Sequence, residues 1–431
     1  MAGMLKVGPV RALAGTVAVP GDKSLSHRSI MLAGLADTRV EVQNFLAAED
    51  CLSTVSCMRA LGVSVDIEPD GRVFVQGKGL YGLSEPDNVL DAGNSGTTIR
   101  LLSGLLAGQS FFSVLTGDDS LRRRPMARII TPLTQMGARI MGRENSRCAP
   151  VAIDATGSLH GIEYRMPVAS AQVKSALMFA ALYADSPTVI SEPYLSRDHT
   201  ERMFAQFGAD IIRDGLAVKV NPASSLRAPS VVEVPGDFSS AAFLLIAATI
   251  LPDSMVTLTN VGVNPTRTGL LDVLRQMGAD IEVMNERLSG MEPVADLRVR
   301  SAKLQGIAID SELIPRLIDE IPVLAVAALF AEGETLIQGA EELRVKETDR
   351  LRAMASELNR MGGSVTERPD GLLIQGQAKL KPAECMTYGD HRVAMSLAVA
   401  GMASEGIVLD DAGCVNISFP GFFDLMKGCC K

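Results

Sequence analysis

One short sequence phrase recurs six times along this chain. We therefore expect the chain to fold as repeated units and not around a single compact core. The phrase is an amphipathic stretch that ends in an apolar residue and is followed by glycine and a β-prone run, as in MRALGVSV and LRQMGADI. Glycine adopts the left-handed conformation that closes a helix without Cβ strain. We therefore predict a helix end and a following strand at Gly62, Gly137, Gly208, Gly278, Gly362 and Gly428.

A second phrase recurs in step with the first. It is a turn of small polar residues followed by an almost wholly apolar helix, as in GDKSLSHRSIML and GDHRVAMSLAVA. Its markers lie 38 to 43 residues before the glycine of the same repeat, at Asp22, Asn94, Ser170, Asp237, Asp319 and Asp390. Two unrelated phrases that keep step six times indicate an internal repeat. Each repeat is predicted to run strand, buried helix, strand, amphipathic helix, strand.

The apolar helices predict how the repeats assemble. A helix that is apolar on nearly every side must be enclosed, and three such helices can enclose one another with sheets outside them. Two similar strings begin at Val19 (VPGDKSLS) and at Val234 (VPGDFSSA). We therefore expect the chain to pass from one domain to the other at Pro20–Gly21 and at Pro235–Gly236. The prediction is an α/β protein of two three-repeat domains, residues 1–20 plus 236–431 and residues 21–235.

Charge and composition exclude several classes of protein. The net charge of −9 argues against a nucleic-acid-binding protein, which needs a broad basic face. Seven scattered cysteines form neither a disulfide framework nor a zinc motif and favour a reducing cytosol. The N-terminus has no signal or transit character, and the longest apolar stretches, 241–251 and 322–331, are too short to span a membrane. We expect a cytoplasmic protein with no membrane association.

The helix starts carry cations where capping alone would not place them. N-capping explains Asp22, Asn94 and Asp390, but a helix dipole disfavours lysine or arginine in the first turn. Cations at these positions suggest a bound anion. The polar residues of these helix starts are Lys23, Ser24, Arg28, Asn94, Gly96, Thr97, Arg100, Ser170, Gln172, Lys174, His391 and Arg392.

Three more basic clusters lie beside the repeats. They are LRRRPM with Arg122, Arg123 and Arg124, SRDHTE with Arg197, and LRVKETDRL with Arg344, Lys346, Glu347 and Arg350. Lys346 and Arg350, four residues apart, are predicted on one helical face. Asp319 and Glu320 at the edge of an apolar helix, together with Glu347, supply carboxylates suited to general acid or base chemistry. The inventory predicts a pocket for a substrate with several phosphate or carboxylate groups.

The sequence contains no complete cofactor-binding motif. GKGLYG at Gly77–Gly82 matches a dinucleotide-binding string, but Ser84–Glu85–Pro86 follows instead of a helix. The sequence has no P-loop, no HExxH and no cysteine–histidine ligand set. We therefore predict no nucleotide cofactor and no metal.

The strings PGDKSLSHR, GNSGTTIR, LRRRPM, ASAQVKSA, SRDHTE, RVKETDRL and GDHRVAMS together resemble the 5-enolpyruvylshikimate-3-phosphate synthase family. The SHR and LxxRPM variants resemble its bacterial branch that includes glyphosate-tolerant members. The resemblance covers essentially the whole chain in the family's order. It implies an inside-out α/β barrel fold of two domains, each with three βαβαββ units, and an active site in the cleft between them.

The resemblance also implies a reaction. The enolpyruvyl group of phosphoenolpyruvate would pass to the 5-hydroxyl of shikimate 3-phosphate by addition and elimination, without a cofactor. Shikimate 3-phosphate would be held by Lys23, Ser24, Arg28, Ser170, Ala171, Gln172, Arg197, Asp319 and Lys346. Phosphoenolpyruvate would be held by Lys23, Gly96, Arg124, Gln172, Arg350 and Arg392. The resemblance gives catalytic roles to Asp319 as the base, Glu347 as the proton donor to the methylene, Lys23 and Lys346. It further implies a monomer inhibited by glyphosate.

Departures and alternatives remain. Many relatives carry lysine where this chain has Ile417, Leu101 stands where other branches have proline, and the chain stops at Lys431 without room for a full strand after Gly428. The sister enolpyruvyl transferase acting on UDP-N-acetylglucosamine shares the repeat but uses a loop cysteine, which the loop around Arg122 to Arg124 lacks. A non-catalytic repeat scaffold that binds polyanions would explain the helix starts but not the placed carboxylates.

Overall fold

The computed structural model describes residues 3–155 and 157–431, which divide into two compact units. The first, called the split unit, consists of residues 3–20, Pro235–Leu288 and Pro293–Lys431. The second, called the insert unit, consists of Gly21–Val234, apart from residue 156, together with Ser289–Glu292. The chain thus leaves the split unit early, builds the whole insert unit and then returns.

The insert unit holds repeats 1 to 3. Repeat 1 comprises β14 (Val231–Glu233), α1 (Lys23–Leu35), β3 (Arg39–Gln43), α2 (Glu49–Ala60), β4 (Ser64–Ile67) and β5 (Val73–Gln76). Repeat 2 comprises β6 (Leu90–Asp91), α3 (Gly96–Leu106), β7 (Phe112–Thr116), the 3-10 turn η1 (Leu121–Arg123), α4 (Ala127–Gln135), β8 (Arg139–Gly142), the short α5 (Arg143–Ser146) and β9 (Cys148–Asp154). Repeat 3 comprises β10 (Glu163–Arg165), α6 (Ala171–Ala181), β11 (Thr188–Ser191), α7 (His199–Gln206), β12 (Ile211–Asp214) and β13 (Ala217–Val220).

The split unit holds repeats 4 to 6. Repeat 4 comprises β2 (Ala14–Ala18), α8 (Phe238–Ile250), β15 (Met255–Gly262), α9 (Gly269–Gln276), β16 (Asp280–Ser289) and β17 (Glu292–Arg300). Repeat 5 comprises β18 (Ala308–Ile309), η2 (Ser311–Leu313), α10 (Ile314–Leu317), α11 (Ile321–Phe330), β19 (Glu334–Ile337), η3 (Glu341–Val345), α12 (Arg350–Arg360), β20 (Ser364–Arg368) and β21 (Gly371–Gln375). Repeat 6 comprises β22 (Ala383–Cys385), α13 (His391–Met402), β23 (Ile407–Leu409), η4 (Gly413–Ile417), α14 (Phe422–Cys429) and β1 (Leu5–Val7).

The described residues form six small sheets, one for each repeat. In repeat 5 the strand order is β18-β19-β21-β20, with β18 and β19 parallel and the other neighbours antiparallel. Repeats 2 and 3 follow the same plan, with orders β6-β7-β9-β8 and β10-β11-β13-β12. A parallel pair needs a crossover helix, and the buried helix of each repeat supplies it. The mixed α/β fold with a βαβαββ repeat is thereby confirmed.

Repeats 1 and 4 exchange their first strands. β2 lies directly before α1 in the sequence, but it pairs in parallel with β15 of repeat 4, Met255 opposite Ala14. β14 lies directly before α8, but it pairs in parallel with β3 of repeat 1, Val231 opposite Glu41. The two similar strings at Val19 and Val234 follow these exchanged strands. Each unit therefore contains a strand that precedes the other unit's helix.

The sixth sheet uses the beginning of the chain. β1 pairs antiparallel with β23, Leu5 opposite Leu409, and the sheet has the order β1-β23-β22. In repeat 5 the corresponding neighbour of β19 is β21, which follows it in the sequence. The missing strand after Gly428 is therefore replaced from the N-terminus. A further bridge joins Leu13, just before β2, to Cys430 near the end of the chain, within the split unit.

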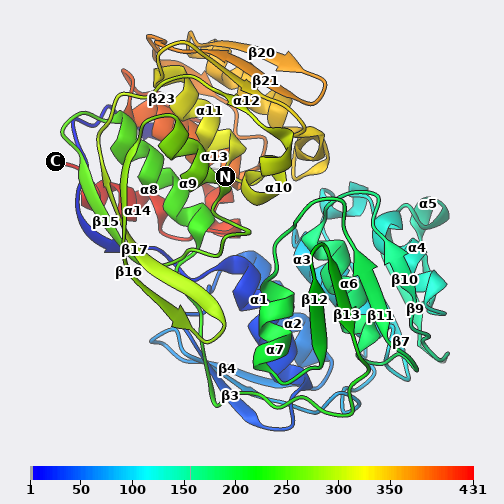
Figure 1. Cartoon of the computed structure of the whole chain (residues 1–431). Coiled ribbons are helices and arrows are strands. Elements are labelled where there is room, and N and C mark those ends of the chain that lie inside the picture. Colours follow the sequence, from blue (N-terminus) through cyan, green and yellow to red (C-terminus); the bar gives the residue numbers. More distant parts are fainter. Residues whose placement is uncertain (1–2, 156) are drawn as a thin grey trace. The chain divides into compact units, whose positions relative to one another are not determined.

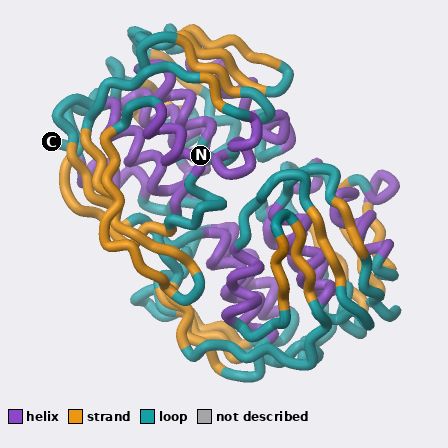
Figure 2. Tube along the Cα trace, in the orientation of Figure 1, coloured by secondary structure: helices purple, strands orange, loops and turns teal. Residues whose placement is uncertain are grey.

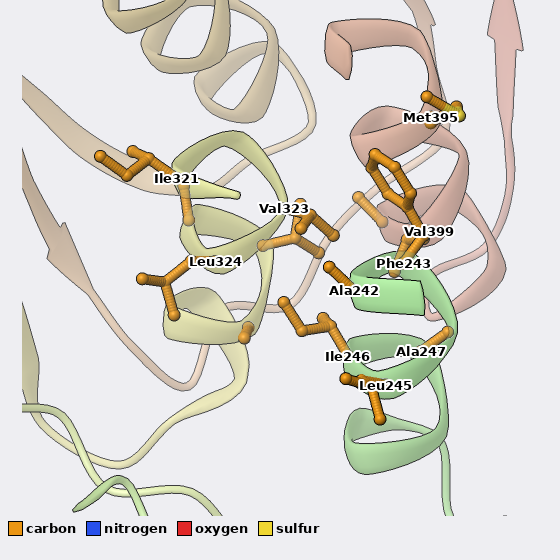
Figure 3. Packing of buried hydrophobic residues seen from close by; sticks show 14 of the residues in the cluster. Ala242, Phe243, Leu245, Ile246, Ala247, Ile321, Val323, Leu324, Met395 and Val399 are labelled. Atoms are coloured by element: carbon orange, nitrogen blue, oxygen red, sulfur yellow. The ribbon is translucent and has the colours of Figure 1, made fainter. Parts of the chain in front are cut away.

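Apolar helices form the centre of each unit, and sheets cover them (Figures 1 and 2). In the split unit α8, α11 and α13 pack on one another, and in the insert unit α3 packs on α1 and α6. Figure 3 shows Ile246 of α8 and Val323 of α11 pointing into the space between those two helices. Every residue of α11 except Phe330 is buried, as predicted for a helix without a polar face. Truncating such a side chain to alanine costs about 2–5 kcal/mol.

Two predicted helix-capping sites need correction. Five of the six repeat glycines do adopt left-handed conformations, with φ between 76° and 96°, but Gly428 does not, because it lies inside α14. Asn94 is not the cap of α3; the neighbouring Ser95 accepts from the Thr98 amide at 3.1 Å. α14 continues to Cys429 and is capped by Cys430, so Gly428 is not the residue that ends the helix.

Candidate active site

The start of α1 presents Lys23 and Ser24 at the surface of the insert unit. Asp22 caps the helix by accepting from the Leu25 amide at 2.9 Å. The Lys23 ammonium lies 2.9 Å from an Asp50 carboxylate oxygen, and Asp50 is in the first turn of α2. Lys23 and Ser24 are both half-buried. The carboxylate of Asp50 therefore holds the lysine against the unfavourable end of the helix dipole.

Arg28 is buried one turn further along α1. Its guanidinium donates to the hydroxyls of Thr200 at 2.7 Å and Ser175 at 2.8 Å, and to the Ser24 carbonyl at 2.9 Å. Burial lowers the pKa of Arg28 to about 10, although the Glu201 carboxylate raises it in part. The side chain thus joins α1 to α6 and α7 and retains N–H groups beyond these three bonds.

Asn94 positions Arg124. The guanidinium of Arg124 donates to the Asn94 side-chain oxygen at 2.7 Å and to its carbonyl at 3.1 Å. The Asn94 amide in turn donates to Asp118 at 2.6 Å. Gly96, the first residue of α3, faces the same cations: a Cβ built there would lie 2.8 Å from Arg100 Nη1 and 3.3 Å from Arg124 Nη1. The absence of a side chain at Gly96 leaves room for both guanidinium groups.

Gln172 connects the starts of α3 and α6. Its amide oxygen accepts from Arg100 at 2.6 Å, and its amide nitrogen donates to Thr97 at 3.1 Å. Ser170 caps α6 through the Val173 amide at 3.4 Å, and Ala171 begins the helix. Ser170, Ala171 and Gln172 are half-buried. The helix starts of repeats 2 and 3 therefore form one polar surface within the insert unit.

The sequence interpretation of Lys174 was wrong. Its ammonium is buried between Glu192 at 2.9 Å and Glu201 at 2.7 Å. The lysine neutralises two internal carboxylates, so it needs no bound anion to explain its place in α6. Arg197 lies just before α7 and is half-buried, and its charge is close enough to Arg28 to contribute to the lowered pKa of that residue.

Arg350 is the centre of the polar group in the split unit. Its guanidinium is buried and lies 2.8 Å from Asp390, 2.5 Å from Glu347 and 3.4 Å from Asp319. Burial alone would lower the pKa of Arg350, but the three carboxylates more than offset this effect and raise it. Asp390 also caps α13 through the Arg392 amide at 2.8 Å. One arginine thus brings together Asp319 and Glu347, two of the three carboxylates selected from the sequence.

Arg392 is the second cation beside Asp319. Its Nη1 donates to the Asp319 carbonyl at 2.9 Å, and its Nε lies 3.8 Å from the Asp319 carboxylate. Asp319 lies in the turn before α11 and is not the cap of that helix. Its carboxylate is 13% exposed. Asp319 is therefore placed between two arginines while part of it remains accessible.

Lys346 and Arg350 do not share a helical face, contrary to prediction. Lys346 follows η3 with extended backbone, and α12 begins only at Arg350, after the cap Asp349. Burial lowers the pKa of Lys346, while the Asp319 carboxylate opposes the change. Arg344 does not belong to the polar group around Arg350. It donates instead to Asp349, Glu367 and the carbonyls of Arg368 and Pro369. Cations that are neighbours in the sequence thus have different roles.

Several partners of these side chains were missed by the sequence interpretation. Asp50, Asp118 and Glu192 each hold a basic or amide side chain, and Arg267 contacts Asp237 at the start of α8. A signal for Arg267 does exist. The segment that leads from the second strand of a repeat into its second helix carries a basic side chain in repeats 2 to 5, at Arg124, Arg197, Arg267 and Lys346.

The two residues that depart from the family pattern, Ile417 and Leu101, pack in the hydrophobic cores. Ile417 is half-buried against the core of the split unit, and Leu101 is fully buried in α3. The seven cysteines are free, and burial raises the pKa of Cys57, Cys385 and Cys414 to about 12. Residues 3–155 and 157–431 contain no group of three or more histidine, cysteine or acidic residues arranged to hold a metal. None of their helices is long and apolar enough to cross a membrane.

Comparison with known proteins identifies relatives over nearly the whole chain. The family model described as EPSP synthase (3-phosphoshikimate 1-carboxyvinyltransferase) matches residues 7–426. The 3-phosphoshikimate 1-carboxyvinyltransferase of Desulforudis audaxviator is 56% identical over 420 residues, 97% of each chain. That of Pelotomaculum thermopropionicum is 55% identical over 426 residues, 98% of each chain.

Solved structures agree with the sequence relatives. EPSP synthase from Acinetobacter baumannii superposes with a TM-score of 0.88 at 43% identity and covers 99% of this chain and 98% of its own. The enolpyruvyl transferase NikO from Streptomyces tendae, 15% identical with a TM-score of 0.79, shares the fold. With a family model and relatives above 50% identity that span the repeats and both polar groups, the chain belongs to the EPSP synthase family.

Proposed function

We propose that this protein transfers the enolpyruvyl group of phosphoenolpyruvate to the 5-hydroxyl of shikimate 3-phosphate and releases phosphate. Family membership supports the reaction class. The observation that carries the proposal is the contact of Arg350 with both Asp319 and Glu347. It places a candidate base and a candidate acid on one cation.

The addition requires two proton transfers. Asp319 takes the proton of the 5-hydroxyl as its oxygen bonds to C2 of phosphoenolpyruvate, and Glu347 gives a proton to the methylene carbon. In the elimination the tetrahedral intermediate returns a methyl proton to the Glu347 carboxylate as the bond between C2 and the phosphate oxygen breaks, and the leaving phosphate takes the proton held by Asp319. An anion that binds Arg350 competes with Glu347 for the guanidinium, which favours a protonated Glu347 at that stage.

Both units supply ligands to the two substrates in this proposal. Shikimate 3-phosphate is assigned to Lys23, Ser24, Arg28, Ser170, Ala171, Gln172, Arg197, Asp319 and Lys346. Phosphoenolpyruvate is assigned to Lys23, Gly96, Arg124, Gln172, Arg350 and Arg392. The polar surface formed by the starts of α3 and α6 supports the first set, and the guanidinium groups of Arg100 and Arg124 beside Gly96 support the second. Removing one charge-assisted contact costs about 1.5–3 kcal/mol.

A phosphate-release assay tests the function. Purified protein is given phosphoenolpyruvate with either shikimate 3-phosphate or UDP-N-acetylglucosamine. We expect turnover when the second substrate is shikimate 3-phosphate and none when it is the UDP-sugar. Asp319→Asn should lower kcat by at least about 100-fold, as loss of a general base does. Turnover with the UDP-sugar would favour the sister transferase, and no turnover with either would favour a polyanion-binding scaffold.

Glyphosate is proposed as an inhibitor that competes with phosphoenolpyruvate. The guanidinium groups of Arg100 and Arg124 beside Gly96 support this proposal, since they offer positive charge to an anion. Inhibition is expected at concentrations near the KM for phosphoenolpyruvate. An inhibition constant far above this KM would contradict the proposal and place the protein with the tolerant members of its bacterial branch.

A further inference from the structure

The start of α8 has no role in the proposed function, yet it contains buried charges. Asp237 caps the helix by accepting from the Ser239 amide at 2.6 Å. Arg267, from the segment between β15 and α9, donates to the Ser239 hydroxyl at 2.8 Å and lies 3.3 Å from Asp237. Arg267 is only 2% exposed. Repeat 4 therefore has a cation at its helix start, although GDFSSAAF itself contains none.

This group continues to Glu320 of repeat 5. The Ser239 hydroxyl, which accepts from Arg267, donates to Glu320 Oε1. The same oxygen lies 3.8 Å from Arg267 Nη1 and 4.0 Å from Arg392 Nη1. The Glu320 side chain is fully buried, and its Oε2 has no hydrogen-bond partner within the described part of the chain. A buried carboxylate of this kind depends on its neighbouring cations.

Glu320 is adjacent in sequence to Asp319, and the two residues share Arg392. Arg392 donates to the Asp319 carbonyl at 2.9 Å while its Nη1 approaches Glu320. Glu320 also starts α11, because its carbonyl accepts from the Leu324 amide at 2.9 Å. Fixing the Glu320 carboxylate therefore fixes the backbone that carries Asp319.

The charges around Asp319 come from several elements. Cations face it from the α12 start, the α13 start and the segment before α12, and carboxylates lie behind them. The charged groups are Arg350, Arg392, Lys346, Glu347, Asp390, Glu320, Arg267 and Asp237. Arg267 and Glu320 form a pair of opposite charges among them.

We propose that Glu320, held by Ser239 and Arg267, is a positioning residue that fixes the Asp319 carboxylate and sets how readily it loses its proton. The inference rests on the proposed role of Asp319 as the base. Removing the Glu320 charge leaves more positive charge near Asp319 and stabilises its ionised form. Removing the Arg267 charge leaves Glu320 uncompensated and has the opposite effect.

Two single variants and their combination test the proposal. Glu320→Gln should move the acidic limb of the kcat–pH profile to lower pH by about one unit, the size of one charge several Å away at an effective dielectric near 20. Arg267→Met should move it to higher pH by a similar amount. The double variant, which is neutral like the native pair, should return the limb towards the wild-type position. KM should change less than kcat in Glu320→Gln, because the substrate cations remain.

A second measurement does not depend on turnover. Carbon-13 NMR of the aspartate carboxyls, with Asp319→Asn used for assignment, should show Asp319 titrating in the same opposite directions. Asp280→Asn, which removes the exposed Arg300–Asp280 pair of repeat 4, is the control and should change neither readout. An Asp319 titration that stays in place, or moves the same way in both single variants, would overturn the inference. Absence of turnover in the wild type together with opposite NMR shifts would instead refute the function and keep the electrostatic coupling.

Discussion

At the scale of single residues, neighbouring charges decide what each polar side chain does. Lys23 and Lys174 both lie in the first turns of buried helices, but Lys23 is half-buried against one carboxylate and Lys174 is buried between two. The sequence shows two lysines in the first turns of equivalent helices. It does not show Asp50, Glu192 or Glu201 beside them, because these partners come from other elements. The residue types of the site could be predicted, whereas their pairing could not.

The close approach of cations to Gly96 leads to a first prediction. In Gly96→Ala the new Cβ would lie 2.8 Å from Arg100 Nη1 and 3.3 Å from Arg124 Nη1, so at least one guanidinium must move. We expect the KM for phosphoenolpyruvate to rise and glyphosate inhibition to weaken by about tenfold or more, which corresponds to about 1.4 kcal/mol. Steady-state kinetics with and without glyphosate measures both. An unchanged inhibition constant would contradict the packing explanation.

His27 gives a pH-dependent prediction. It is fully buried, and its Nδ1 lies 2.6 Å from the Thr54 hydroxyl. Burial, together with the charges of Lys23 and Arg28, holds the pKa of His27 well below its ordinary value of 6.5. Because the folded-state pKa is below the unfolded one, the unfolded chain takes up the proton first as pH falls. Stability should therefore be lost below about pH 6.5, by up to about 1.4 kcal/mol per pH unit for this one proton.

Chemical denaturation between pH 7 and pH 5 measures this dependence. His27→Gln keeps a polar group beside Thr54 but cannot titrate, so its stability should fall less over the same range. The exposed His160, which contacts Asp185 at 2.6 Å, offers the control His160→Gln, which should retain the wild-type dependence. Equal pH dependence in the wild type and His27→Gln would show that other groups govern acid stability.

At the scale of elements, local patterns predicted helices well and strand partners poorly. α8 and α11 could be found because an unbroken apolar run has one solution, a fully enclosed helix. The exchange of β2 and β14 could not, since the paired residues lie 241 and 190 positions apart and the pairing leaves no local trace. The prediction that Lys346 and Arg350 share a helical face was wrong for a local reason, because Asp349 caps a new helix between them.

The repeat glycines allow a matched pair of variants. Gly278 closes α9 with φ of 93°, where an L-residue with a Cβ is strained, whereas Gly428 lies inside α14 with open space around it. Gly278→Ala should lower stability by about 1–2 kcal/mol. Gly428→Ala should leave it unchanged or raise it by up to about 1 kcal/mol, because alanine favours a helix interior. Thermal unfolding of both proteins decides the question, and equal losses would contradict the assigned conformations.

At the scale of the whole molecule, the split unit is assembled from both ends of the sequence. β1 completes the sheet of repeat 6, and the Lys431 amide donates to the Ala12 carbonyl at 2.9 Å. The completion of this sheet by β1 was not predicted from the sequence, in which the segment after Gly428 is too short for a full strand. The domain pattern was accessible because the strings at Val19 and Val234 are alike, but the use of the N-terminus as a strand was not.

Deleting residues 1–8 tests this assembly. Without β1, strand β23 becomes an edge, and its amides should exchange faster by hydrogen–deuterium exchange. Exchange in β5 and β9 of the insert unit should not change. The milder variant Lys6→Pro, which removes one backbone donor from β1, serves as a check that keeps the chain length. Equal protection of β23 in all three proteins would show that β1 contributes nothing to the sheet.

The exchanged strands have a consequence for synthesis on the ribosome. The insert unit can complete its three sheets once β14 has been made, so it is able to fold while the remainder is still being translated. β2 must wait for β15, and β1 must wait for β23, about 400 residues later. At about 5–20 residues per second this is tens of seconds. During that interval β1, the first strand to leave the ribosome, is the last to find its partner, so nascent chains of this protein should depend on chaperones at their N-terminus.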